Sequence, residues 1–334
     1  MRFIASIAGR KNEFMKTVKV LHNPKAGAAE LDKKKLLKLL QTAGYRCSYT
    51  STKKSGWDNI DTGKTDFVVL AGGDGTVRKV AKTILNLRLA IGLIPLGTAN
   101  NIARTLGVSG TPREIVDGWN ETEMKPFDVG RIYGLKDAAF FLEGMGFGVF
   151  PKLMREMQKQ KHKKPGAPEE NLKTALHLLH DIILNAKARY CKITLDGADH
   201  SGKFILAEVM NTQSIGPNLT LASFADPGDG QLDVILIAER QREEFAAYVH
   251  NKMHGIEQPA VFNFLKAKNL DIYWEGKMLH VDDEIIELKK PKDIRIKLQE
   301  SVLKFMVPRK IEDENGKVVT INTEPEKPLK RKAD

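Results

Sequence analysis

The spacing of hydrophobic residues divides the chain near residue 134. Before that point, short apolar runs alternate with stretches in which apolar residues recur every three to four positions, which are the patterns of buried strands and amphipathic helices. The expected elements are strand 17–22, helix 30–43, strand 45–50, helix 56–62, strand 67–70, helix 76–86, strand 90–94 and helix 99–106. Regular alternation of this kind is typical of a parallel sheet with helices on both faces.

After residue 134 the pattern changes to short strands with few helices between them. The expected strands are 138–142, 190–195, 203–210, 232–238, 270–274, 278–281, 293–298 and 303–307, with one amphipathic helix over 171–188. Several strands alternate polar and apolar residues, which indicates a sheet with one buried face. We therefore predict an α/β protein with a parallel α/β domain at 16–134, a β-rich sandwich or strongly curved sheet at 135–309, and a polar, flexible tail at 310–334.

A glycine-rich turn follows the strand at 67–70. Residues 71–76 read Ala-Gly-Gly-Asp-Gly-Thr and precede a helix. Glycine allows close approach of the backbone to a ligand, and a helix N-terminus favours an anion, so this turn is suited to phosphate. Asp74 alone would repel phosphate, which favours a divalent cation between them or a hydrogen bond to a sugar or a transferring group. An ordinary strand-to-helix turn would contain similar glycines.

Two further polar turns follow neighbouring strands. Asn-Pro-Lys-Ala-Gly stands at 23–27, and Pro-Leu-Gly-Thr-Ala-Asn stands at 95–100. In an open α/β sheet the ligand crevice lies at the carboxyl ends of the strands, where all three turns would meet. None of the three is a G-x-x-x-x-G-K-[ST] or G-x-G-x-x-G motif, which disfavours a P-loop enzyme and a dinucleotide-binding protein.

In this order, the motifs resemble those of the diacylglycerol kinase catalytic-domain superfamily, especially the soluble bacterial lipid kinases. The similarity covers about residues 18–308, with N-P-x-[SA]-G, G-G-D-G-T and P-x-G-T-x-N in the first half and weaker matches at 127–131, 141–148, 229–233 and 302–308. It implies an ATP-dependent kinase whose first domain is like that of NAD kinases and phosphofructokinases. The residues that the resemblance assigns to ATP are Asn23, Thr52, Gly72, Gly73, Asp74, Gly75, Thr76, Gly97, Thr98 and Asn100.

The resemblance also implies two catalytic roles. Asp74 would position Mg²⁺ at the phosphates, and Glu284 would remove the proton of the lipid hydroxyl as general base. Two residues depart from the family pattern, because Asn101 stands where aspartate is usual and Asp283 stands where a D-G-E motif has glycine. A nucleotide-binding regulatory protein without turnover therefore stays open, as does a solvated hairpin turn at 282–284.

A second candidate magnesium site lies in the turn Asp-Pro-Gly-Asp-Gly-Gln at 226–231. In the enzymes that this chain resembles, the turn holds a structural Mg²⁺ through one side chain and two carbonyls. The resemblance assigns these ligands to the Asp229 carboxylate and the carbonyls of Asp226 and Gln231. Oxygen ligands suit this cation, but a plain hairpin turn without a metal fits the same residues.

Charge and composition narrow the choice of partner. The 334 residues carry a net charge of +11, with basic clusters at 159–164 and 327–332 that we expect in an exposed loop and in the tail. Neither cluster is interleaved with aromatic residues, so we predict no nucleic-acid partner. We predict instead a peripheral contact with an anionic membrane. Charged segments that are simply solvated are the alternative for either cluster. Apolar runs stay below the ~18 residues of a membrane span, and the run at 3–9 is short for a secretory signal, so we expect a cytoplasmic protein. The two cysteines support neither a disulfide framework nor a zinc site.

The sequence thus predicts transfer of the γ-phosphoryl group of ATP to a lipid hydroxyl, with diacylglycerol as the expected acceptor and phosphatidic acid as the product. ATP would lie between the two domains, and the lipid would enter over the β-rich one. Sphingoid or ceramide lipids, or a soluble acceptor such as NAD, fit the same motifs. The oligomeric state is not set by the sequence, and a homodimer is one of the open choices.

Overall fold

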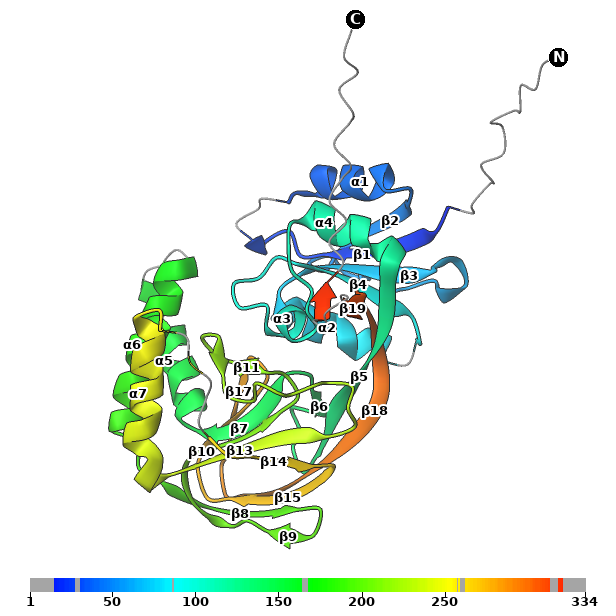
Figure 1. Ribbon diagram of the computed structural model, residues 1–334. Coiled ribbons are helices and arrows are strands. Elements are labelled where there is room, and N and C mark those ends of the chain that lie inside the picture. The colour runs from blue at the N-terminus through cyan, green and yellow to red at the C-terminus, as the bar shows by residue number, and fades with distance from the viewer. Residues whose placement is uncertain are drawn as a thin grey trace, which may run out of the picture.

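The computed structural model describes residues 15–27, 31–85, 87–163, 168–256, 258, 262–312 and 318–320. It has an α/β part and a β-rich part, connected by two long strands (Figure 1). The apolar run at 3–9, the basic cluster at 327–332 and most of the predicted tail lie outside the described residues. Within the part of the chain that is described, no helix is long and apolar enough to cross a membrane.

The α/β part is a parallel sheet with helices between its strands. The strands are β1 (Thr17–His22), β2 (Arg46–Ser51), β3 (Phe67–Gly72) and β4 (Ala90–Pro95). The helices are α1 (Lys33–Thr42), α2 (Asp74–Ile84), α3 (Asn101–Thr105) and α4 (Pro112–Asp117). The strand order is β2-β1-β3-β4, all parallel, which confirms the predicted fold of this part. Because the order reverses between β1 and β3, the turns after these two strands lie next to each other, where ligands bind in such sheets.

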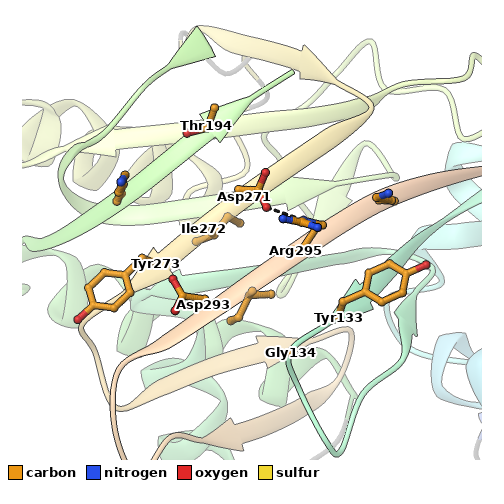
Figure 2. A pocket seen from close by; sticks show the side chains of 11 residues that line it. Tyr133, Gly134, Thr194, Asp271, Ile272, Tyr273, Asp293 and Arg295 are labelled. Atoms are coloured by element: carbon orange, nitrogen blue, oxygen red, sulfur yellow. Dashed lines mark hydrogen bonds and ion pairs between the residues drawn. The ribbon is translucent and has the colours of Figure 1, made fainter. Parts of the chain in front are cut away.

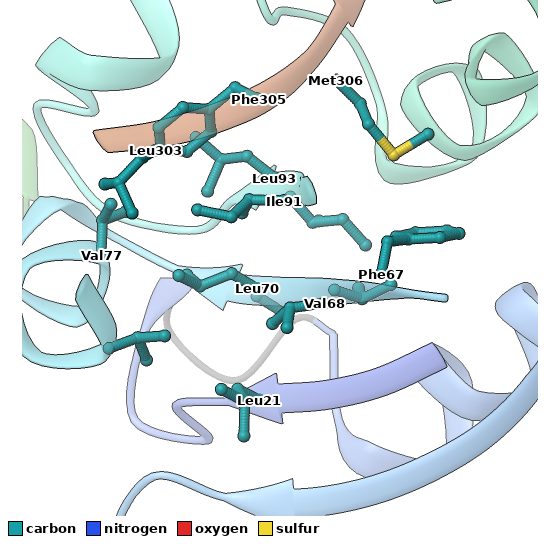
Figure 3. Close-up of a cluster of buried hydrophobic side chains, with 14 of the residues drawn as sticks. Leu21, Phe67, Val68, Leu70, Val77, Ile91, Leu93, Leu303, Phe305 and Met306 are labelled. Atoms are coloured by element: carbon teal, nitrogen blue, oxygen red, sulfur yellow. The ribbon is translucent and has the colours of Figure 1, made fainter. Parts of the chain in front are cut away.

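The core of the α/β part is centred on β3, whose six residues are all buried. Figure 3 shows Leu70 of this strand between Leu21 of β1 and Ile91 of β4, with Phe305 of the C-terminal strand above them. Each fully buried aliphatic side chain of this size contributes about 1.5–3 kcal/mol to the free energy of folding. The apolar strands therefore fix the points at which the three polar turns begin.

One strand, β18 (Lys292–Pro308), extends through both parts of the molecule. It pairs in parallel with β4 and antiparallel with β5 (Thr122–Tyr133), and its first half also pairs with β15 (Asn269–Trp274). The register shifts between Gln299 and Leu303, and Ser301 there has a φ of 54°. We predicted two separate strands at 293–298 and 303–307, but the polar residues between them form an irregular bend inside one strand.

The β-rich part consists of mostly antiparallel strands, which confirms the predicted class of this part. Its other strands are β6 (Phe140–Phe141), β7 (Gly144–Gly148), β8 (Arg189–Leu195), β9 (Ala198–Asp199), β10 (Gly202–Met210), β11 (Ser214–Ile215), β12 (Leu219–Thr220), β13 (Leu232–Ala238), β14 (Phe264–Ala267), β16 (Met278–Val281) and β17 (Glu284–Glu287). Three helices, α5 (Val149–Lys163), α6 (Pro168–Leu184) and α7 (Arg242–Met253), pack together on one side of the strands (Figure 1).

Several sequence predictions were wrong. The segment 56–61 forms a turn and irregular chain instead of a helix, and a single 3₁₀ turn follows at Thr62–Lys64. At the start of the predicted helix, Gly56 has a φ of 69°, which an α-helix does not accommodate. Residues 159–163 of the basic cluster are helical and not a loop, since α5 runs to Lys163, and α7 was not predicted at all. Part of the tail is ordered as an antiparallel pair, β19 (Lys310–Glu312) with β20 (Val318–Thr320).

Candidate functional site

The glycine-rich turn after β3 is shorter than the sequence indicated. Helix α2 begins at Asp74 with Gly73 as its N-cap, so the second half of the motif is the first turn of the helix. The first N–H groups of a helix have no partner inside it and can receive an anion. A Cβ on Gly73 would lie 2.8 Å from the Gly97 Cα, and a Cβ on Gly72 would lie 2.6 Å from the Thr76 Cβ. Glycine is therefore required where the turns after β3 and β4 touch.

Two asparagine side chains hold the polar turns in place. Asn23 Nδ2, after β1, donates to Thr76 Oγ1 on α2 at 3.1 Å. Asn100, with a φ of 50°, accepts the Gly97 N–H and donates to the Gly97 carbonyl, both at 2.8 Å. The three turns predicted to bind phosphate thus meet at one edge of the sheet and are fixed by their own side chains. Thr98 is exposed in the last of these turns.

Thr52 lies at the same edge, after β2. Its N–H donates to the His22 carbonyl at 2.9 Å, its hydroxyl is 3.4 Å from the same oxygen, and its carbonyl accepts from Lys79 Nζ. The side chain is buried, and Thr52 does not belong to the lining of the cleft described below. A direct contact of this residue with ATP stays a prediction.

The Asp74 carboxylate caps helix α3. Its Oδ2 accepts the Asn101 N–H at 3.0 Å and its Oδ1 accepts the Ile102 N–H at 3.1 Å, so α3 begins at Asn101, later than predicted. Burial raises the pKa of Asp74, although these two hydrogen bonds oppose the shift. The two N–H groups hold the carboxylate where the turns after β3 and β4 meet.

A second carboxyl group, from the β-rich part, faces this position. Glu143 accepts a hydrogen bond from Asn101 Nδ2 at 3.0 Å. Burial and the negative charge of Asp74 raise the pKa of Glu143 well above its usual value. The hydrogen bond between Asn101 and Glu143 joins the two parts of the molecule. Asn101 is one of the two residues that depart from the family pattern. Sequence reasoning missed Glu143, and only the glycine-rich stretch around it pointed to this region.

The acidic turn at 282–284 connects β16 to β17, and its first residue is structural. Asp282 has a φ of 50°, and its side chain is 1% exposed. The carboxylate accepts the backbone N–H groups of residues 142–144 at 2.8–3.2 Å. Burial raises the pKa of Asp282 to about 6, whereas Arg78 and these N–H groups act to lower it.

Arg78 of α2 binds all three acidic residues of this turn. Its Nε lies 3.1 Å from Asp282 Oδ2, and its Nη1 lies 3.0 Å from Asp283 Oδ1 and 2.9 Å from Glu284 Oε1. The side chains of Arg78 and Asp282 are 4% and 1% exposed, whereas those of Asp283 and Glu284 are 61% and 51% exposed. The hairpin turn that the sequence left open is therefore buried at its first residue and solvated at the other two. Sequence reasoning missed this arginine. Its signal was a charged residue between Val77 and Val80, on the buried side of a predicted helix.

A cleft of about 530 Å³ lies between these groups. Residues of the glycine-rich turns, Asn101 and three further acidic residues form its polar end. They are Gly73, Asp74, Gly75, Gly97, Thr98, Asn101, Glu143, Asp282 and Asp283. Its other wall is apolar and comes chiefly from α5 and α6, through Phe150, Leu153, Met154, Met157, Leu172 and Ala175. The arrangement places the glycine-rich turns and carboxyl groups next to an apolar wall. Glu284 is not among the residues that line it.

His280 lines the same cleft and supports the acidic turn. Its Nδ1 donates to the Asp282 carbonyl at 3.0 Å, and its Nε2 lies 2.9 Å from Glu208 Oε1. Both side chains are at most 1% exposed. Burial by itself would lower the pKa of His280, but the Glu208 carboxylate raises it overall. The pair was not predicted, because its members lie on separate strands.

The residues of the cleft fit a magnesium ion that arrives with a nucleotide. In the described part of the chain, no group of three or more His, Cys, Asp or Glu side chains is arranged to hold a metal ion. Mg²⁺ at a nucleotide needs only one or two carboxylates, because phosphates and water complete its shell. Asp74 and Asp283 line the cleft and offer such oxygens.

The turn at 226–231 fits a metal less well. The Asp229 carboxylate is bound by Lys266 Nζ at 2.5 Å and by the Gln231 N–H at 2.9 Å. The Asp226 carboxylate is bound by Lys125 Nζ at 2.5 Å, and its carbonyl accepts the Asp229 N–H. Lysine ammonium groups thus stand where the sequence predicted a cation, and a structural Mg²⁺ here would have to displace Lys266.

Another hollow, of about 660 Å³, lies on the outer face of the β-rich sheet and shares no residue with the cleft (Figure 2). It is lined by residues of β5, β8, β15 and β18, including Tyr133 and Tyr273. Asp271 and Arg295 form an ion pair across it at 2.7 Å. Without a glycine-rich turn in its lining, this surface does not offer the chemistry predicted from the motifs.

Comparison with known proteins confirms the resemblance that the motifs indicated. Residues 17–132 match the family model of the diacylglycerol kinase catalytic domain, and residues 160–303 match that of the YegS C-terminal NAD kinase beta sandwich-like domain. The diacylglycerol kinase of Bacillus subtilis (strain 168) is 28% identical over 288 residues, 81% of this chain and 90% of that protein. The diacylglycerol kinase of Staphylococcus carnosus (strain TM300) is 25% identical over 307 residues, 84% of this chain and 97% of that protein. A crystal structure of a diacylglycerol kinase from Bacillus anthracis str. Sterne has the same fold, with a TM-score of 0.66 and 24% identity over 89% of this chain and 98% of that one.

Proposed function

We propose that this chain transfers the γ-phosphoryl group of ATP to the free hydroxyl of diacylglycerol. The chain is a member of the diacylglycerol kinase family and combines the catalytic domain with the β-rich C-terminal domain. The observation that carries the proposal is the cleft, in which the glycine-rich turns and an apolar wall line one cavity. The turns suit the phosphates of ATP. The wall of α5 and α6 is mainly apolar, with Gln158 and Asn171 as its polar residues, and suits acyl chains.

The phosphates are expected to bind at the first turn of α2. The N–H groups at the start of this helix and the positive end of the helix dipole favour negative charge there. Gly73 and Gly97 leave no side chain between the backbone and the ligand. Mg²⁺, when bound, would neutralise charge on the phosphates. We expect Asp74 to orient this ion, and the two N–H groups of α3 that hold its carboxylate support this role.

The chemical step moves one phosphoryl group and one proton. The acceptor oxygen forms a bond to the γ-phosphorus while the bond to the β,γ-bridging oxygen breaks and ADP leaves. The hydroxyl proton passes to a carboxylate of the acidic turn. The resemblance assigns this role to Glu284, whose Oε1 and Oε2 lie 2.9 and 3.1 Å from Arg78. Asp283 lines the cleft instead, with its Oδ2 against Gly75.

Paired amide substitutions decide which carboxylate accepts the proton. With Glu284 as base, Glu284→Gln lowers kcat by about 100-fold or more, whereas Asp283→Asn lowers it by less than about tenfold. The affinity for ATP stays near the wild-type value in Glu284→Gln, because Glu284 does not line the cleft. The reverse order of effects on kcat would transfer the role of base to Asp283.

The acceptor is identified by offering several hydroxyl compounds in parallel. Transfer of labelled γ-phosphate from ATP is measured with diacylglycerol, a sphingoid base, ceramide and NAD. The proposal expects labelled phosphatidic acid as the main product. Label in the sphingoid base or ceramide would keep the lipid class but change the substrate, and label only in NAD would overturn the lipid acceptor.

A nucleotide-binding protein without turnover is a second candidate, and it also rests on the acidic turn. Arg78 binds both oxygens of Glu284, and Asn101 occupies a position where the family usually has aspartate. Binding of ATP with no label in any acceptor would favour this candidate.

Diacylglycerol lies in a membrane, so we also propose that the protein works as a cytoplasmic enzyme at an anionic bilayer surface. Lys152, Arg155 and Lys159 follow one side of α5, next to the apolar wall of the cleft. Each such cation near an anionic surface contributes about 1 kcal/mol of attraction. Co-sedimentation with phosphatidylglycerol vesicles at low salt, lost at high salt, is the expected result, and equal binding to neutral vesicles would contradict it.

A further inference from the structure

A basic pocket of about 330 Å³ lies beside α5 and is distinct from the cleft. Its cationic residues come from three separate segments. These residues are Lys152 and Arg155 of α5, Lys187 before β8 with Arg189 at its start, and Lys277 between β15 and β16. One acidic residue, Glu287, is also in the lining. Nothing in the proposed phosphoryl transfer uses this pocket.

The positive charge of the basic pocket is mostly uncompensated. Arg155 is paired with Glu287. The other four cationic residues have no acidic partner within 4.0 Å in the described part of the chain. Burial and the nearby charge of Arg189 lower the pKa of Lys152. Cations brought together in this way repel one another unless an anion lies between them.

The backbone of the basic pocket is shaped by close packing. The indole of Trp274 lines the floor, and its Nε1 donates to the Met278 carbonyl at 3.2 Å. A Cβ on Gly276 would lie 2.3 Å from that indole nitrogen, so only glycine fits. The tight turn over the tryptophan places Lys277 at the rim. Phe204 and Leu288 complete an apolar floor under the cations.

We propose that the basic pocket binds a phosphate group, either free or as the head group of an anionic phospholipid. A phosphate offers several strong acceptor oxygens, which suit converging ammonium groups and a guanidinium fork. The apolar floor would accommodate the organic part of a phosphate ester. The binding needs no ATP and no turnover, so the proposal stands or fails independently of the proposed kinase activity.

An occupied pocket would also affect the cleft through α5. Lys152 and Arg155 face the basic pocket, while Leu153 and Met157 of the same helix line the cleft. An anion that binds the two cations therefore fixes the helix whose other side forms the apolar wall. The pocket is placed to sense a phosphate-rich membrane surface next to the acceptor channel.

The test compares two double variants of the full-length chain. Arg189→Gln with Lys277→Gln removes two exposed cations from the basic pocket. Lys192→Gln with Lys297→Gln removes two exposed cations from the outer face in Figure 2, where Asp271 and Asp293 lie among the basic residues. Both variants lose the same charge from the same part of the molecule, so a general electrostatic effect changes them equally.

Two probes separate the possible sources of phosphate. Inorganic phosphate is titrated at constant ionic strength with tryptophan fluorescence as the signal, and vesicles of phosphatidylcholine are compared with and without phosphatidic acid. The pocket variant lacks two charged hydrogen-bond donors and is expected to lose at least about tenfold in affinity, whereas the control stays within about twofold. Loss with inorganic phosphate identifies a free-phosphate site, and loss with vesicles alone identifies a head-group site. Equal behaviour of the two variants with both probes would overturn the proposal.

Discussion

Replacing Arg78 with leucine tests the contact between α2 and the acidic turn. The substitution leaves the Asp282 carboxylate, which is 1% exposed, without its cation, although three N–H groups still bind it. Removing one partner of a buried ion pair costs about 3–5 kcal/mol of the free energy of unfolding. The contacts with Asp283 and Glu284, whose side chains are 61% and 51% exposed, add about 0–1 kcal/mol each.

The loss of stability depends on pH through Asp282. In the wild-type protein, burial raises the pKa of Asp282 to about 6, above the ~3.9 of an unfolded chain. A raised carboxyl pKa means that the folded state binds the proton more tightly, so the contribution of this group to stability falls as the pH rises from about 4 to 6. Without Arg78 the pKa rises further. The variant is therefore most destabilised above pH ~6, and its deficit shrinks at lower pH, where Asp282 is protonated in both proteins.

Urea unfolding followed by tryptophan fluorescence at pH 8 and pH 5 measures this difference. The double variant Arg78→Leu with Asp282→Asn is expected to regain part of the loss at pH 8, because no buried charge remains. Arg113→Leu is a matched control, since Arg113 is 78% exposed, and it is expected to change stability by less than about 0.5 kcal/mol. A loss below about 1 kcal/mol for Arg78→Leu at pH 8, or the same loss at both pH values, would refute the reasoning.

Three further substitutions test separate parts of the site. Gly73→Ala pushes the turns after β3 and β4 apart and is expected to weaken ATP binding by about tenfold or more in calorimetry. In the control Gly118→Ala the new methyl group meets nothing within 4 Å, so the affinity for ATP stays unchanged. Equal affinities of the two variants for ATP would contradict the close contact between the turns. Met157→Glu places a charge on the apolar wall and is expected to raise the KM for diacylglycerol by about tenfold, with little change in the KM for ATP. Parallel changes in the two KM values would argue against acyl-chain binding at this wall. Glu208→Gln removes the carboxylate that raises the pKa of His280, so the imidazole titrates at lower pH in NMR, and an unchanged pKa would disprove the pairing. Because the His280 pKa is raised in the folded state, the stability from this pair is present below pH ~6.5 and is lost as the pH rises through the folded pKa.

The parts of the fold that the sequence predicted are those encoded by local patterns. Strand β3 is a continuous apolar run, and the turns after β1, β3 and β4 contain glycines that the backbone requires at those points. Because parallel strands end at one edge of the sheet, the strand order brought Asn23, Thr76 and Gly97 together as predicted. Helix α5 was missed because its lysine-rich end reads as a solvated loop, while its apolar side is recognisable only against α6.

The parts that were missed depend on contacts between distant segments. Arg78 and Glu284 are separated by 206 positions along the chain, and Asn101 and Glu143 by 42. No periodicity relates such residues, since each lies on a different element and meets its partner only after folding. The apolar channel could not be predicted for the same reason, because its lining comes from α5, α6 and the loop near β11.

The central claim is that the glycine-rich turns and the acidic turn form one site of phosphoryl transfer to a lipid. It is tested by measuring labelled phosphatidic acid formed from γ-labelled ATP and diacylglycerol by the wild type, Asp74→Asn and Glu284→Gln, with bound ATP determined in the same samples. The account predicts labelled product from the wild type and its loss in both variants, with ATP still bound by Glu284→Gln. Undiminished transfer by both variants, or a wild type that binds ATP and labels no lipid, would contradict it.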